Sequence, residues 1–314
     1  MLKPVQVSIL IPMRNMEAFI VETLSTLLLE NSLSIEILIV DDLSTDKSVE
    51  KIEALDDDRI RILQGAGKGI SAALNLAITE AKGEVLMRCD ADDLYPPGRI
   101  ELQFYWLKDN PEFGAVCGGF DAIDVNSQHV SNMPTGELAE EITSELLSGI
   151  TRTTFCAFAV RAEVMKNIGG FRSYFVTAED IDFSLRLSGY TRVMYLPGLC
   201  YSYRLHNGST VHSQASIQRI FYENTARLFQ QQRVLRDHDD LELGTPPSAP
   251  KAEGVADKAD EQIQGLLIAT AWKAHASGNK LRALSLAWRS FKLNPLKFKY
   301  YRSSLALLLK PSKK

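Results

Sequence analysis

The first ninety residues alternate strand-like and helix-like segments, and this alternation constrains the fold more than any other feature of the sequence. Strands are predicted at the apolar, partly β-branched segments 5–11, 35–40, 59–63 and 84–89. Helices are predicted at the intervening segments 17–29, 48–55 and 70–80. Such a β-α-β series predicts an α/β fold in which a mainly parallel sheet is covered by helices.

The second half of the sequence continues the alternation less regularly. Further helices are predicted at 98–110, 137–148, 177–187 and 214–236. Further strands are predicted at 115–120, 155–160 and 191–196, the last closed by Pro197. We therefore expect one α/β domain over residues 1–236.

Charge divides the remaining residues into two segments. Residues 237–262 hold eight acidic residues and three prolines, which predicts a flexible, solvated linker. Residues 263–314 hold eleven Lys or Arg and no acidic residue, and their apolar spacing predicts a basic helical extension. The rest of the chain is acidic, which argues against nucleic acid as a partner.

Length and composition exclude several classes of protein. A chain of 314 residues with 45% hydrophobic and 24% charged residues is typical of a soluble globular protein. No uninterrupted apolar run reaches the ~20 residues that span a bilayer, and we expect no secretory signal before the first strand. The four cysteines lie far apart, so we expect neither a zinc site nor disulfides but a reducing, cytoplasmic compartment.

Carboxylates cluster after two of the predicted strands. In parallel sheets, ligands bind beyond the carboxyl ends of the strands, which makes these positions informative. Asp90-Ala91-Asp92-Asp93 places three carboxylates where a Mg²⁺ or Mn²⁺ ion shared with substrate phosphates would offset their repulsion. The alternative for this motif is an acidic turn in water.

Asp41 and Asp42 follow the second strand. A carboxylate held there can accept a hydrogen bond from a nucleobase or a ribose hydroxyl. The alternative is that these residues begin the next helix as N-caps. The spacing alone leaves both interpretations open.

The glycine-rich segment at residues 65–69 is neither a P-loop nor a dinucleotide-binding motif. The P-loop pattern fails at Ile62 and at Gly69, and the GxGxxG pattern fails at Ile70. A glycine loop that presents Lys68 to a nucleotide and a plain turn into the next helix both remain open.

Two polar segments in the second half carry further candidates. Thr177 and Asp180 fit a capping box, although a carboxylate beside the aromatic residues at 171–175 would also have a raised pKa and serve as a base. Arg204 and His206 suit a diphosphate and a Mn²⁺ ion, whereas a lone histidine is more often structural.

Taken together, these segments resemble the family 2 glycosyltransferases, which have the Rossmann-like GT-A fold. The resemblance covers residues 5–215. The matching segments are 7–12, 37–42 with Ser44 and Asp46, 69–75, 83–84, 90–93, 169–171, 179–180, and 203–204 with His206.

The resemblance implies transfer of a sugar, with inversion, from a UDP-, GDP- or dTDP-linked donor to a saccharide or lipid-linked acceptor in cell-surface polysaccharide or glycolipid synthesis. Asp180 would be the general base, and Glu179 would lie beside it. The donor would be bound by Pro12, Arg14, Asp41, Asp42, Lys68, Asn75, Asp90 and Arg204. The metal, Mg²⁺ or Mn²⁺, would be held by Asp90, Asp92 and His206.

Two other functions stay open at this stage. A sugar nucleotidyltransferase shares the layout but usually has a glycine-rich signature after its first strand, where this chain has Met13-Arg14-Asn15. A catalytically inactive nucleotide-sugar-binding scaffold is the other alternative.

The tail at residues 291–314 mixes basic with aromatic and aliphatic residues. It is expected to dock on the acidic body, with a peripheral contact on the inner face of the membrane as the alternative.

Overall fold

The structure is a computed structural model that describes residues 4–208, 216–251, 259–293 and 298–310. The chain forms two compact units. The first comprises Met1–Phe120, Pro134–Tyr203 and Arg219–Pro250, and the second comprises Asp121–Met133, Arg204–Gln218 and Lys251–Lys314.

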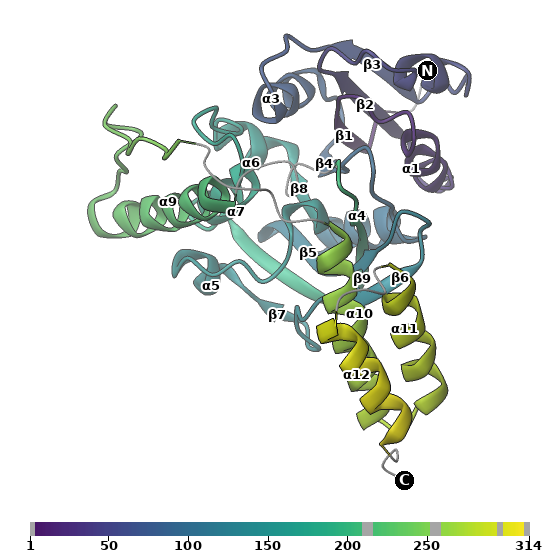
Figure 1. The fold of residues 1–314 in the computed structure, drawn as a ribbon. Helices are drawn as coiled ribbons and strands as arrows, with labels where there is room; N and C mark the ends of the chain where they lie inside the picture. The colour runs from purple at the N-terminus through teal and green to yellow at the C-terminus, as the bar shows by residue number, and fades with distance from the viewer. Residues whose placement is uncertain (1–3, 209–215, 252–258, 294–297, 311–314) are drawn as a thin grey trace. The chain divides into compact units, whose positions relative to one another are not determined.

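The predicted α/β architecture is confirmed, with a sheet that is mixed (Figure 1). The strands are β1 (Val7–Met13), β2 (Ile35–Asp41), β3 (Ile60–Gln64), β4 (Val85–Arg88), β5 (Phe113–Ile123), β6 (His129–Asn132), β7 (Glu140–Glu141), β8 (Phe158–Arg161) and β9 (Arg192–Arg204). Their order is β3-β2-β1-β4-β8-β5-β9-β7, and β6 pairs with β5. The pairs among β1, β2, β3 and β4 are parallel, and β8 joins β4 in the antiparallel direction.

The first helices, α1 to α4, alternate with the strands, and the later ones do so less regularly. The helices of the first half are α1 (Ile20–Leu27), α2 (Ser48–Glu53), α3 (Ile70–Glu80), α4 (Arg99–Asp109), α5 (Thr143–Leu147), the 3₁₀ turn η1 (Phe155–Ala157) and α6 (Ala162–Asn167). Those of the second half are α7 (Glu179–Leu187), α9 (Ser216–Arg236), α10 (Ala259–Ala276), α11 (Lys280–Leu293) and α12 (Phe298–Leu309).

Alternate side chains of the parallel strands build two cores, because successive residues of a strand point to opposite faces. Ile9 of β1 packs in one core with Leu24 of α1. Leu10 packs in the other core with Leu74 of α3. Both faces are thus buried, which explains why β1 and β2 read as continuous apolar runs.

The expectation of a solvated linker is wrong at Asp239, whose side chain is fully buried. The Asp239 carboxylate pairs with Arg172 at 2.6 Å and also with Arg233 of α9. Two guanidinium groups offset the cost of removing this charge from water. The part of the acidic segment up to Pro250 therefore belongs to the first unit.

The second unit contains three mutually packed helices, α10, α11 and α12. Arg289 of α11 donates to the carbonyl oxygen of His129 at 2.7 Å and to Asp124 Oδ2 at 2.8 Å. These contacts attach the helices to the 121–133 segment of the same unit. No helix within the described ranges has the length and apolar character required to cross a bilayer.

Candidate active site

The carboxyl ends of β1, β2 and β4 lie at one edge of the sheet. Met13 at the end of β1 is in register with Asp41, and Leu10 is in register with Arg88. The Asp90–Asp93 segment follows Arg88 directly. The two acidic segments predicted from the sequence therefore share this edge, where parallel sheets bind ligands.

Asp41 and Asp42 stabilise loops at this edge, and neither is a helix cap. Asp42 accepts the N–H of Gly67 at Oδ1 (2.7 Å) and the N–H of Gly69 at Oδ2 (2.9 Å). Asp41 Oδ1 accepts the N–H of Ser44 at 3.1 Å. Helix α2 begins after Lys47 with no capping side chain, so the N-cap alternative for the two aspartates is wrong.

The close approach of Asp42 to the glycine loop explains one of its glycines. A Cβ atom on Gly65 would lie 2.7 Å from Asp42 Oδ1 and 3.0 Å from the carbonyl oxygen of Asp41. Since these distances are shorter than normal contacts, only glycine fits without displacing the aspartates.

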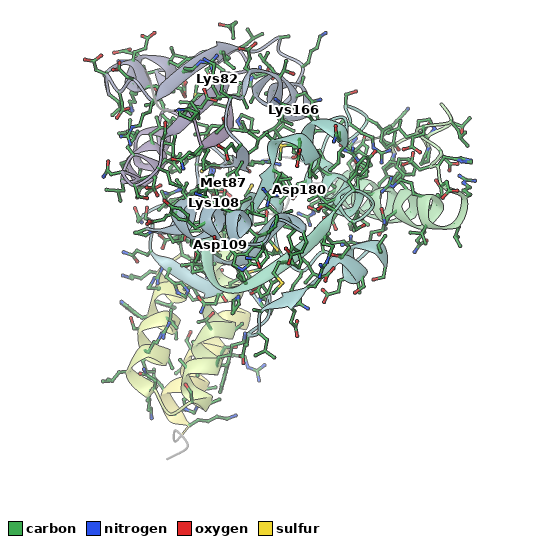
Figure 2. All side chains as sticks on the ribbon, turned by 180° about the vertical axis from the view of Figure 1, so that it is seen from behind. Lys82, Met87, Lys108, Asp109, Lys166 and Asp180 are labelled. Atoms are coloured by element: carbon green, nitrogen blue, oxygen red, sulfur yellow. The ribbon has the colours of Figure 1, made fainter. Side chains whose placement is uncertain are left out.

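We expect Asp42→Ala to lower the free energy of unfolding by about 1–3 kcal/mol and to raise the KM for donor, because two backbone N–H groups lose a charged acceptor. The matched control is Asp109→Ala, which removes an exposed carboxylate at the end of α4 (Figure 2) and should change stability by less than ~0.5 kcal/mol. Urea unfolding and donor titration measure both quantities. Equal effects of the two substitutions would contradict the role of Asp42 in holding the loop.

The other predicted donor residues differ in how they are held. Arg14 and Lys68 are exposed, and Pro12 is partly exposed within β1. Both polar atoms of the Asn75 amide bind the backbone of Phe171. Asn75 Nδ2 donates to the Phe171 carbonyl oxygen at 2.8 Å, and Asn75 Oδ1 accepts the N–H of Phe171 at 2.7 Å. This pair joins α3 to the segment before α7. The donor roles of these four residues stay predictions.

A buried arginine connects the Asp90–Asp93 segment to the start of α7. Arg88 Nε donates to Asp90 Oδ1 at 2.7 Å and Nη2 donates to Oδ2 at 3.2 Å. Its third nitrogen, Nη1, donates to Glu179 Oε1 at 3.0 Å. Burial alone would lower the pKa of Arg88, but the charges of Asp90 and Glu179 hold it well above its ordinary value. Arg88 thus joins the predicted donor-side carboxylate to the predicted acceptor-side pair.

Tyr201 of β9 fixes the segment that contains the aspartates. Its hydroxyl accepts the N–H of Asp90 at 3.0 Å and donates to Asp93 Oδ2 at 2.6 Å. Leu94 and Ser202 exchange backbone hydrogen bonds immediately beside it. The turn at 90–94 is therefore hydrogen-bonded to β9 and has residues 91–93 buried, so the alternative of an acidic turn in water does not describe it.

Asp92 lies buried in this turn, and its role as a cation ligand stays a prediction. Across the part of the chain that the structure describes, no three His, Cys, Asp or Glu side chains converge into a complete metal site. Mg²⁺ and Mn²⁺ at phosphate-transfer sites commonly use one or two carboxylates, with substrate phosphates and water as the remaining ligands. The Asp90–Asp93 turn, called the aspartate turn below, fits that chemistry, although both oxygens of Asp90 already bind Arg88.

Glu179 and Asp180 open helix α7, and the predicted capping box is wrong. The N-cap position is occupied by Ala178 without a side-chain hydrogen bond, and its φ of 62° places it in the left-handed region. Thr177 precedes this turn and caps nothing. The helix is held instead through Asp182, whose buried carboxylate binds Arg172 and, at 2.9 Å, Arg186.

The environment raises the pKa of both acids at the start of α7. Burial raises the pKa of Glu179 to about 7, opposed by the charge of Arg88 and reinforced by that of Asp180. Burial also raises the pKa of Asp180, again opposed by Arg88. The Asp180 side chain (Figure 2) remains partly exposed, whereas Glu179 is buried. Asp180 is thus the member of the pair that a substrate can reach.

The raised pKa of Glu179 predicts a pH-dependent stability. Unfolded Glu179 loses its proton near its ordinary pKa of 4.5, whereas the folded protein retains it to about 7. The folded state binds more protons than the unfolded state between these two pKa values. The contribution of Glu179 to stability therefore falls as pH rises from 4.5 to about 7 and is constant above that. We expect Glu179→Gln to remove this slope, which urea unfolding at several pH values would show. If the free energy of unfolding of the variant had the same dependence on pH as that of the wild type, other groups would be its cause.

The two remaining predicted residues, Arg204 and His206, belong to the second unit. Arg204 is fully buried and donates to the carbonyl oxygen of Asp124 at 3.3 Å and to Ser127 Oγ at 2.9 Å. His206 Nδ1 accepts the N–H of Gly208 at 3.2 Å. These contacts favour a structural role for Arg204, and the diphosphate and metal roles of the two residues stay predictions.

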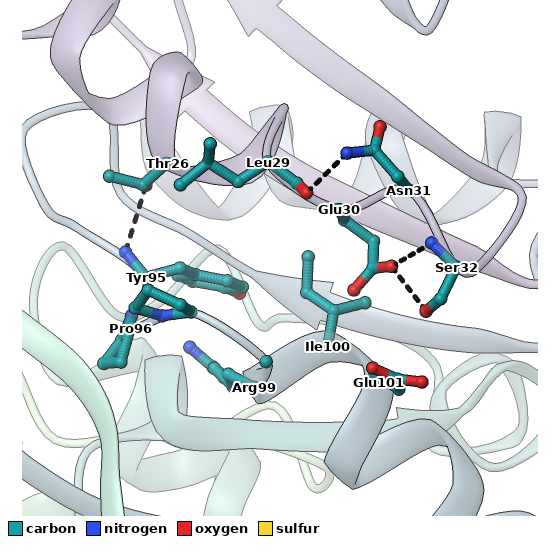
Figure 3. Close-up of a pocket in the computed structure, with 12 residues that line it drawn as sticks. Thr26, Leu29, Glu30, Asn31, Ser32, Tyr95, Pro96, Arg99, Ile100 and Glu101 are labelled. Carbon is teal, nitrogen blue, oxygen red and sulfur yellow. Dashed lines mark hydrogen bonds between the residues drawn. The ribbon is translucent and has the colours of Figure 1, made fainter.

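A cavity of about 280 Å³ lies beside the end of α1 and the start of α4 (Figure 3). Its lining includes Tyr95, whose N–H donates to Thr26 Oγ1, and Glu30, which accepts two hydrogen bonds from Ser32. None of the described residues that line it is a predicted site residue. We therefore place the candidate active site at the sheet edge that carries Asp41, Asp42 and the Asp90–Asp93 turn, called the aspartate edge below. This cavity is not part of the candidate site.

Sequence reasoning missed Arg88 and Tyr201 as site residues. A signal for Arg88 was present, because it is the one charged residue in the otherwise apolar segment 85–89. Arginine is rarely fully buried unless it is paired, so a charge inside a buried strand indicates partners. Tyr201 carries no such signal, since its partners are distant in the sequence.

Comparison with known proteins identifies the family of this chain. The sequence matches the family described as "Glycosyl transferase family 2" over residues 8–175, more than half of the chain. The chain belongs to glycosyltransferase family 2. The matched region includes the glycine loop and the aspartate turn of the candidate site.

Several curated proteins are similar to much of this chain. A hyaluronan synthase of Pasteurella multocida is 28% identical over 229 residues, which cover 68% of this chain and 22% of that protein. A chondroitin synthase of P. multocida strain Pm70 is 29% identical over 220 residues, which cover 65% of this chain and 21% of that protein. The putative glycosyltransferase EpsE of Bacillus subtilis is 29% identical over 194 residues, covering 58% and 66%. The chain thus spans about a fifth of the length of the two synthases.

Solved structures of S. aureus TarS (residues 1–349) share the fold. The complex with UDP-GlcNAc superposes with a TM-score of 0.56 at 16% identity, covering 97% of this chain and 80% of that chain. The complex with UDP has a TM-score of 0.55 at 17% identity, covering 96% and 91%. This family 2 glycosyltransferase therefore has the predicted GT-A fold.

Proposed function

We propose that this chain transfers a sugar from a nucleoside-diphosphate donor to an acceptor hydroxyl with inversion at the anomeric carbon. The observation that carries the proposal is the shared contact of Arg88 with Asp90 and Glu179. It holds a carboxylate of the aspartate turn and the paired acids of α7 in one rigid group. Inversion by a single displacement needs a base and a neutralised leaving group but no protein nucleophile.

Asp180 is the proposed general base. Its raised pKa brings the carboxyl closer to neutral pH, where a base accepts a proton more effectively. It remains partly exposed, so an acceptor hydroxyl can approach it. Glu179 is buried against Arg88 and acts as a positioning residue for the start of α7.

The sheet edge supplies the proposed donor site. Asp41 and Asp42 order the loops at the nucleoside end, and Asp90 faces the ribose while Arg88 holds both of its oxygens. A divalent cation bound by Asp92, with Asp90 as a further predicted ligand, would neutralise the charge that develops on the departing diphosphate. Arg14 and Lys68 are exposed cations from neighbouring loops that suit its phosphates.

Relatives indicate the class of donor and acceptor. TarS binds UDP-GlcNAc and UDP, which supports a nucleotide-sugar donor, and we retain UDP-, GDP- and dTDP-linked sugars as candidates. The names hyaluronan synthase and chondroitin synthase support a role in polysaccharide synthesis, with a saccharide or lipid-linked acceptor. The four cysteines are buried and unpaired, which supports a reducing, cytoplasmic location.

Release of nucleoside diphosphate tests the proposal. Incubation with a panel of nucleotide sugars and Mn²⁺ should give slow hydrolysis of one donor, lost on removal of Mn²⁺ by a chelator. Formation of a nucleotide sugar from a sugar phosphate and a nucleoside triphosphate would instead identify a nucleotidyltransferase. Donor binding without any release, with or without saccharide acceptors, would identify a non-catalytic scaffold.

A further inference from the structure

One end of the three-helix group in the second unit joins the start of α11 to the end of α12 (Figure 1). Lys280 Nζ donates to the carbonyl oxygen of Lys310 at 3.3 Å, and His275 Nε2 lies 3.2 Å from the same atom. The turn between α10 and α11 and the last residues of α12 therefore lie side by side. We call residues 272–282 and 308–310 the helical tip.

Three leucines of the helical tip are exposed to solvent. The exposed fractions are 84% for Leu281, 56% for Leu308 and 81% for Leu309. The opposite faces of the same helices are buried, as Ala283 and Leu307 show with no exposed surface. The leucines are thus not part of the core that holds the helices together, and such an apolar group on a surface indicates a binding site.

The charged side chains within the helical tip are all basic. Lys273, Arg282 and Lys310 are exposed, and Lys280 is partly exposed. No acidic residue follows Glu261 in the sequence, and Glu261 lies in the first turn of α10. The fifteen-residue separation from Ala276 corresponds to roughly 22 Å along the helix. This exceeds the Debye length of about 8 Å at physiological ionic strength, so Glu261 does not neutralise the tip.

We propose that the helical tip docks on an anionic lipid surface. Leucines that enter the boundary of the acyl chains, flanked by lysine and arginine among the headgroups, are the combination by which interfacial helices bind such membranes. Pairing of two tips would bring two sets of like charges together, which disfavours a second copy of the same surface as the occupant. The proposal concerns attachment and is independent of the transferase chemistry.

Sedimentation of the full chain with lipid vesicles tests this attachment. Wild-type protein should bind phosphatidylcholine vesicles that contain phosphatidylglycerol, and should bind pure phosphatidylcholine vesicles much more weakly. A Lys280→Gln/Arg282→Gln/Lys310→Gln variant should bind the anionic vesicles roughly 100-fold more weakly. High salt should also weaken the binding of wild-type protein to the anionic vesicles, because it screens the attraction between opposite charges.

The leucines are tested by Leu281→Ser/Leu308→Ser/Leu309→Ser, which should lower the affinity by more than about tenfold. The matched control is Leu235→Ser, because Leu235 of α9 is also 84% exposed but belongs to the first unit. All these side chains are exposed, so far-ultraviolet circular dichroism should be unchanged.

Three outcomes would overturn the proposal. If wild-type protein does not bind anionic vesicles, a lipid surface is not the partner of the helical tip. Equal binding by wild type and the leucine variant places any attachment elsewhere. A concentration-dependent dimer that forms without lipid and disappears in the leucine variant assigns the tip to a second copy of the chain.

Discussion

Asp180→Asn is expected to lower the rate of sugar transfer by about 10²–10⁴-fold while donor binding stays within about twofold of wild type. The amide retains the shape of the side chain but cannot accept the proton of the acceptor hydroxyl. The substitution also removes a carboxyl whose pKa is raised by burial, so the protein should not lose stability. Initial rates at saturating donor and calorimetric titration of the nucleoside diphosphate separate the two effects.

The control for Asp180 is Asp109→Asn, which changes an exposed carboxylate at the end of α4 and should leave the rate unchanged. Asp180→Glu keeps a base but moves it, and should retain part of the activity. An Asp180→Asn enzyme with a normal rate would remove this residue from the role of base.

Arg88→Met should cause the largest loss of stability, about 3–5 kcal/mol in the free energy of unfolding. Methionine has a similar length but leaves Glu179 buried without its cation and releases both oxygens of Asp90. Arg88→Lys should recover only part of the loss, because one ammonium group cannot reproduce the two-oxygen contact with Asp90 and also reach Glu179. Urea unfolding measures the differences.

The comparison for Arg88 is Arg192→Met. Arg192 pairs with Glu141 at 2.6 Å, but the two side chains are 50% and 37% exposed, so the loss of stability should be much smaller than for Arg88→Met. A double variant Arg88→Met/Glu179→Gln should be more stable than Arg88→Met alone at about pH 8, because glutamine replaces a carboxyl group that, without Arg88, must either stay ionised and unpaired or take up a proton. Equal losses for Arg88→Met and Arg192→Met would contradict the central place of Arg88.

The first four strands were predictable because their signal is local. Short, mostly apolar segments separated by polar turns define β1 to β4, and the predicted helix 70–80 coincides with α3. Elements held by distant partners were missed: β6 and β7 have four and two residues, too few for a periodic pattern. The strand predicted to end at Pro197 continues to Arg204, and the basic tail contains helix α12.

The candidate site was predictable to the extent that its residues follow strands. Asp41, Asp42 and Asp92 were located by that rule, and the structure places them at one sheet edge. Thr177 was misassigned because Ala178 adopts a left-handed backbone that no capping pattern announces. The burial of Asp239 depends on two arginines far from it in sequence, which composition cannot show.

Binding of nucleoside diphosphates tests the central claim most directly, since the account rests on the aspartate edge as the donor site. Calorimetry with UDP, GDP and dTDP should show binding of at least one of them in the presence of Mn²⁺, weakened more than about tenfold by a chelator or by Asp92→Asn. The same affinity for wild type and Asp92→Asn, with and without Mn²⁺, would contradict it.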